Sequence, residues 1–117
     1  MLLAWSSTRL KVCCLTGVQL RAAAGDQVAA AEDLLYLVTR APMLRDLGSM
    51  QSVRLGVLAG NLTLSMDEVD MHAHTLSSDG VARSLPNRAP LPEHASTEAL
   101  LVHDFHVRGR SVLRRAS

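Results

Sequence analysis

Apolar residues recur along the chain with two different spacings, and the change of spacing separates a helical part from strands. Between Asp26 and Arg40 they return every three or four residues, which is the spacing of one helix face. Asp26 is suited to cap the start of this helix, and Pro42 ends it. A shorter helix is expected from Met43 to Leu47, before Gly48. The apolar face of the longer helix consists of Val28, Ala31, Leu35 and Val38.

Strict alternation of apolar and polar residues predicts strands in the second half of the chain. Residues 52–58 and 62–66 alternate, and Ala59-Gly60-Asn61 between them has the composition of a hairpin turn. Val69 and Met71 extend the alternation into a further strand. The last ordered element is expected over residues 100–107. If that strand is regular, one of its faces carries Leu101, His103, Phe105 and Val107.

Residues 1–25 permit two interpretations. Apolar and polar residues alternate between Arg9 and Arg21, which predicts a folded N-terminal strand. The same segment bears arginine and hydroxyl residues and no acid, which is the composition of a mitochondrial targeting segment that has not been cleaved. The sequence alone favours neither interpretation.

Together these elements predict an α+β fold in one small domain. A chain of 117 residues with 48% hydrophobic residues has the size and composition of a single domain with a core. We expect an N-terminal strand, one main helix, a β-hairpin and a long proline-containing loop over residues 77–96. The chain then divides into a basic N-terminal segment (1–25), an α+β domain (26–107) and a basic tail (108–117).

Charge is distributed unevenly although the net charge is only +1. All eleven acids lie between Asp26 and Asp104, whereas both ends of the chain carry only basic residues. Basic ends are suited to contact an acidic protein surface or RNA. This pattern predicts a small non-enzymatic accessory subunit of a larger assembly, of the mitochondrial ribosomal or respiratory kind.

The two cysteines, Cys13 and Cys14, are adjacent in the sequence, so they do not form a zinc-binding pair with the usual two-residue gap. Neighbouring cysteines also seldom bridge each other. Free thiols predict a reducing, intracellular location, and the N-terminal composition makes mitochondria the candidate compartment. No apolar run is long enough to span a membrane.

Residues 69–80 contain the densest set of metal-ligand side chains in the chain. Asp70, His72, His74 and Asp79 lie within them, and Asp79 precedes Gly80. Alternate residues of a strand point the same way, so His72 and His74 could both face one metal ion. The turn at Gly80 would fold Asp79 back over that ion.

The order Val-Asp-Met-His-Ala-His-Thr, followed by Ser-Asp-Gly, resembles the first metal-binding motif of the PHP (polymerase and histidinol phosphatase) superfamily of phosphoesterases. The resemblance implies that His72, His74 and Asp79 are ligands of a divalent metal such as Zn, Mn or Fe. The family's second motif, Thr-Asp-His, has its counterpart near Asp104 and His106, which the resemblance adds as metal ligands. In this chain Phe105 stands at the histidine position, and His106 follows one residue later.

The family's later ligands have no counterpart, because no His, Asp or Glu follows His106. One copy of the chain cannot complete a three-metal site. The sequence therefore predicts a divalent-metal-binding fragment or relative of a PHP-type phosphoesterase, with the question of enzymatic activity open. The accessory subunit is the alternative.

Overall fold

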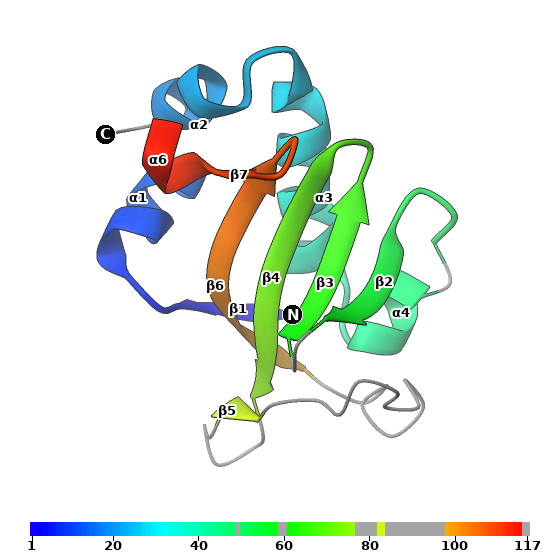
Figure 1. Cartoon of the computed structure of the whole chain (residues 1–117). Helices are drawn as coiled ribbons and strands as arrows, with labels where there is room; N and C mark the ends of the chain where they lie inside the picture. Colours follow the sequence, from blue (N-terminus) through cyan, green and yellow to red (C-terminus); the bar gives the residue numbers. More distant parts are fainter. Residues whose placement is uncertain (49, 59–60, 77–81, 84–97, 116–117) are drawn as a thin grey trace.

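In a computed structural model, which describes residues 1–48, 50–58, 61–76, 82–83 and 98–115, a mixed sheet carries helices on one face (Figure 1). The main strands lie in the order β1-β6-β4-β3-β2, with β5 paired to β4 and β7 paired to β6. The pairing is antiparallel except between β1 and β6. The strands are β1 (Leu2–Trp5), β2 (Arg54–Leu58), β3 (Asn61–Met66), β4 (Val69–Leu76), β5 (Ala82–Arg83), β6 (Ala99–Val107) and β7 (Arg110–Ser111). The α+β class expected from the sequence is confirmed.

The helices fall into two groups. The longest, α3, lies behind the sheet, whereas α1, α2 and α6 gather beside β6 (Figure 1). No helix in the described part of the chain is long and apolar enough to cross a membrane. The helices are α1 (Thr8–Leu15), α2 (Gly17–Ala24), the 3-10 turn η1 (Gly25–Gln27), α3 (Val28–Arg40), α4 (Leu44–Gly48) and α6 (Val112–Arg115).

The core lies between the helices and one face of the sheet. Strand β4 alternates buried and half-buried residues along its whole length, so one face points into the core and the other points away from it. The buried residues of α3 include Ala31, Leu34 and Val38, which recur at helical spacing. The helices predicted over residues 26–40 and 43–47 correspond to α3 and α4. The cap predicted at Asp26 is wrong, because Asp26 lies in η1 and Gln27 is at the N-cap position of α3.

The strand predicted between Arg9 and Arg21 is wrong, because this segment forms α1 and α2. Ser7 caps α1 by accepting a hydrogen bond from Leu10 N at 3.1 Å. In both helices the buried residues recur at intervals of three and four, as in one face of a helix. They are Leu10, Cys13 and Cys14 in α1, and Leu20, Ala23 and Ala24 in α2. Apolar and polar residues also alternate in this segment, and that alternation suggested a strand. The N-terminal strand lies earlier, at Leu2–Trp5.

The predicted hairpin is present as β2 and β3, which pair in register from Arg54 opposite Ser65 to Leu58 opposite Asn61. Residues 59 and 60 of its turn lie outside the described residues. Most of the loop predicted over residues 77–96 also lies outside them. The part of it that is described is β5, which pairs with the end of β4.

Residues 108–115, expected as part of a basic tail, contribute a turn, β7 and α6 to the domain. Arg108 adopts a positive φ of 53° in the turn. Its side chain forms ion pairs with Asp26 at 2.6 Å and with Glu68 at 2.7 Å. These pairs are exposed, so their contribution to stability is small. They nevertheless join the β6–β7 turn to the start of α3 and to the β3–β4 turn.

Substituting Leu35 with Asp tests how α3 is packed. Leu35 is 8% exposed, so the new carboxylate would be buried without a partner. We expect the free energy of unfolding to fall by about 3 to 5 kcal/mol, measured by urea denaturation. The matched control is Ala29→Asp, an exposed position of the same helix, which should change stability by less than about 0.5 kcal/mol. Equal stability of the two variants would show that α3 does not pack as described.

Candidate functional site

A bulge in β6 determines which side chains share a face of the sheet. Opposite β4, the register runs from Asp70 facing His106 to His72 facing Asp104, and then shifts by one residue. Beyond the shift, Ala73 faces Val102. His103 is therefore the extra residue. Because of it, the buried side chains on both sides of the bulge face the core. The predicted face of Leu101, His103, Phe105 and Val107 is wrong for this reason.

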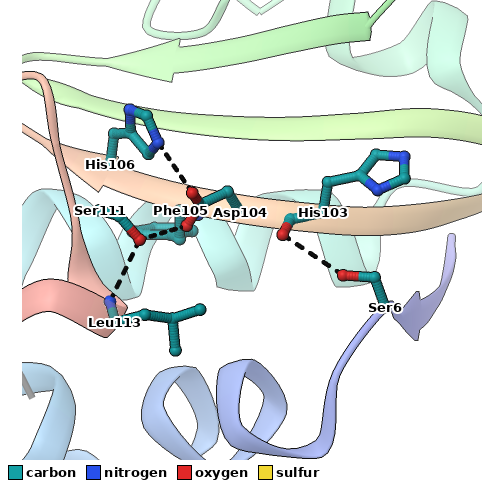
Figure 2. A network of polar contacts seen from close by, with 7 residues as sticks. All are labelled: Ser6, His103, Asp104, Phe105, His106, Ser111 and Leu113. Carbon is teal, nitrogen blue, oxygen red and sulfur yellow. Dashed lines mark hydrogen bonds and ion pairs between the residues drawn. The ribbon is translucent and has the colours of Figure 1, made fainter. Parts of the chain in front are cut away.

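Polar groups from the β1–α1 connection and from β6 itself satisfy the backbone at the bulge. Ser6 N donates to Val102 O at 2.9 Å, and Ser6 Oγ donates to His103 O at 3.3 Å. On the other side, Phe105 N donates to the Asp104 carboxylate at 2.8 Å. Figure 2 shows Ser6 beside His103 and, further along the strand, Asp104 with its partners. A bulge leaves backbone N–H and C=O groups without hydrogen-bond partners on the neighbouring strand, and these contacts provide such partners.

The face of the sheet away from the core carries a polar cluster that we call the polar face. Its titratable members are half-buried, and they come from two adjacent strands. On β4 they are Asp70, His72 and His74, and on β6 they are His103, Asp104 and His106. The bulge is what places His103 and His106 together on this face, because regular alternation would separate them.

The four histidines of the polar face form two pairs, each with one ring from β4 and one from β6. The rings of His72 and His106 are edge to face with centroids 4.5 Å apart. The rings of His74 and His103 are 4.0 Å apart, and His103 Nε2 contacts His74 Nδ1 by a hydrogen bond. The hydrogen bond between His74 and His103 lets that pair share a proton.

Asp104 is the centre of the hydrogen-bond network in Figure 2. Ser111 Oγ donates to it at 2.6 Å, and His106 Nε2 lies 3.0 Å from its second oxygen. Leu113 N in turn donates to Ser111 Oγ at 3.2 Å, which joins α6 to the network. Burial alone would raise the pKa of Asp104. The hydrogen bonds from Ser111, Phe105 N and His106 outweigh burial and lower that pKa.

The state of Asp104 fixes the tautomer of His106. An ionised carboxylate only accepts hydrogen bonds, so His106 Nε2 carries a proton, and in the neutral imidazole Nδ1 is then the nitrogen with the lone pair. In Figure 2 the second ring nitrogen of His106 lies on the side away from Asp104. A carboxylate that orients a histidine in this way is the usual support of a metal-binding imidazole.

Two histidines of the polar face are held in the neutral form. Burial, followed by the nearby His106, lowers the pKa of His72, although Asp70 and Asp104 oppose this shift. Burial, followed by the nearby His74, lowers the pKa of His103. Neutral imidazole is the form that binds metals.

The residues predicted from the motif are partly brought together. His72 and His74 share a face of β4 as expected, and Asp104 and His106 lie on the neighbouring strand. Asp79 lies outside the described residues. Over the part of the chain that is described, no group of three or more His, Cys, Asp or Glu side chains has a geometry that could hold a metal ion.

His103 was not among the predicted site residues. The spacing of the apolar residues could have identified His103. Leu100, Val102, Phe105 and Val107 can share one face only if one extra residue lies between Val102 and Phe105. That extra residue turns His103 and Asp104 to the same side of the strand.

The cysteines do not belong to this site. Cys13 and Cys14 are buried and free. Burial and the neighbouring Cys13 raise the pKa of Cys14 to about 12, so its thiol stays protonated and unreactive at neutral pH.

A half-open hollow of ≈ 450 Å³ adjoins the polar face where β6 meets β7. Its lining consists of Asp104, His106, Gly109, Ser111 and Leu113. The hollow leaves space for a small ligand beside the supported imidazole of His106.

Comparison of the chain with family models, with curated proteins and with solved structures found no match. The resemblance of residues 69–80 to the PHP motif therefore stays a prediction from the sequence.

Acid should destabilise the fold first through the histidines. Because the pKa values of His72 and His103 lie below the ordinary value of 6.5 in the fold, the unfolded chain takes up these protons at higher pH. The free energy of unfolding should therefore decrease as the pH falls below about 6.5. Asp104 makes its full contribution to the free energy of unfolding above the pKa that it has in the unfolded chain. That contribution is lost only at lower pH, as the pH falls through the depressed pKa of Asp104 in the fold.

Urea denaturation at several pH values between about 7 and 5 measures this effect. A variant with His72→Asn and His103→Asn should show a flatter dependence of stability on pH than the unsubstituted protein. His94→Asn serves as the control, because the sequence position of His94 lies outside β4 and β6, the two strands that carry the polar face. If all three proteins lost stability in parallel, these two histidines would not be the groups that titrate.

Proposed function

We propose that this protein binds a divalent transition-metal ion at the polar face, with His72 and His106 as its first protein ligands. The observation that carries the proposal is the pairing of these two imidazole rings across adjacent strands, with centroids 4.5 Å apart. One ring of the pair is held by a carboxylate through the nitrogen that does not face the metal.

The chemistry of the donors favours a particular class of metal. Imidazole nitrogen with carboxylate oxygen suits zinc and iron better than manganese, which prefers mostly oxygen ligands. Asp70 stands in register with His106, so its carboxylate is near enough to add charge at the site. The remaining coordination positions would be open to water, to a substrate, or to Asp79 from the same motif.

Two further features support a ligand at this face. The hydroxyl of Thr63, in register opposite His72, is buried and has no hydrogen-bond partner among the described residues. A group bound at His72 would supply such a partner. His74 and His103 extend the set of imidazoles along the same two strands.

Hydrolysis of phosphoesters is the reaction that the PHP-like motif implies for such a metal. This part of the proposal rests on the motif alone. The alternative role as an accessory subunit, the contact with RNA and the mitochondrial location also stay predictions, because they rest on composition and charge.

Metal binding can be measured by calorimetric titration of the protein with zinc after removal of metals by a chelator. The double variant His72→Ala and His106→Ala should lose more than about a hundredfold in affinity, since changes to supporting residues alone cost 10-fold to 100-fold. His94→Ala, at a sequence position outside β4 and β6, should bind as the unsubstituted protein does. Equal zinc affinity in all three proteins would contradict the proposed site.

Substituting Asp104 with Asn tests whether this carboxylate positions His106. Asn keeps the shape of the side chain but supports the imidazole less strongly, so zinc affinity should fall by about 10-fold to 100-fold. Glu68→Gln is the control, because Glu68 lies in the exposed ion pair with Arg108. Melting temperatures of both variants separate a loss of folding from a loss of ligand positioning. Full affinity in Asp104→Asn would exclude the positioning role.

A further inference from the structure

The fold brings the two basic ends of the chain to the same side of the molecule. Helices α1 and α2 come from residues 1–25, which contain no acid, and α6 comes from the basic C-terminal segment. Figure 1 shows the three helices side by side, and they contact one another. Arg9 Nη2 donates to Leu113 O at 2.9 Å, which joins the first helix to the last.

Large apolar side chains project into solvent from the same helices. Val12, Leu15 and Val18 are 43%, 59% and 81% exposed, although they lie within seven residues of one another. The residues that pack into the core from these helices are different ones, such as Leu10 and Leu20. The helices therefore carry apolar residues on the outside as well as on the inside.

Exposed basic residues stand among these apolar ones. Lys11 precedes Val12 in α1, and Arg21 follows Val18 by three residues in α2. We call the exposed outer faces of α1 and α2, with Lys11, Val12, Leu15, Val18 and Arg21, the basic-apolar surface.

We propose that the basic-apolar surface binds the anionic surface of a lipid membrane. Basic side chains attract the phosphate groups of anionic lipids, and apolar side chains enter the boundary between headgroups and acyl chains. A surface with basic charge, no acid and protruding aliphatic side chains combines both contributions. An acidic protein would match the charge, but it would not by itself account for the exposed aliphatic residues.

Co-sedimentation with lipid vesicles tests the proposal. The full chain should bind vesicles of phosphatidylcholine and phosphatidylglycerol, and it should not bind vesicles of phosphatidylcholine alone. Replacing Lys11 and Arg21 with Gln should weaken partitioning about twenty-fivefold, since each basic residue near an anionic membrane contributes about fivefold. Added salt should weaken binding of the unsubstituted protein in the same direction.

A second variant tests the apolar contribution. Leu15→Ser with Val18→Ser should weaken vesicle binding about tenfold at any salt concentration, because buried apolar area is lost. The control combines Tyr36→Ser with Arg45→Gln, an exposed aromatic residue and an exposed basic residue outside the basic-apolar surface. It should bind vesicles as the unsubstituted protein does.

Circular dichroism and light scattering of each protein complete the test. All the substituted positions are exposed, so the helical signal should be unchanged. Equal binding to neutral and anionic vesicles, or equal binding by the control and both variants, would overturn the proposal. The proposal would also be overturned if the unsubstituted protein formed a dimer, and if the Leu15→Ser and Val18→Ser variant were monomeric but bound vesicles equally well. A second copy of the chain would then cover this surface.

Discussion

The antiparallel pairing of β4 with β6, including its bulge, is the interaction on which the rest of the structure depends. Both strands lie inside the sheet and both have one face in the core. The buried residues of β6 are spaced by two, then three, then two, so no regular strand could bury all of them. One extra residue at His103 resolves this conflict. The same extra residue determines which polar side chains face away from the core.

Elements with long, unambiguous periodicity could be predicted from the sequence, and elements with short or mixed periodicity could not. The face of α3 repeats over three turns, and the hairpin of β2 and β3 has a turn sequence between two alternating runs. Between Leu10 and Leu20, apolar residues fit a period of two as well as intervals of three and four. Packing against β6 and α6 selects the helical form there, and this information lies in distant parts of the chain.

The candidate site was predictable to the same extent. Alternation along a single strand places His72 and His74 on one face, and this needs no knowledge of the fold. Their partners come from β6, so the pairing of His72 with His106 and of His74 with His103 depends on strand register. Register follows from burial of a whole face, including the bulge, and single-strand reasoning had placed His103 and His106 on opposite faces.

Asp104 connects the backbone of the bulge to the chemistry of the polar face. One of its oxygens accepts hydrogen bonds from Phe105 N and Ser111, and the other faces His106 Nε2. The conformation of the strand and the orientation of the imidazole therefore share one carboxylate, and neither can change without affecting the other. Ser111 adds α6 to this coupling through Leu113 N. A ligand at His106 would therefore meet a ring whose position is set by β6, β7 and α6 together, which is the rigidity that metal binding by few protein ligands requires.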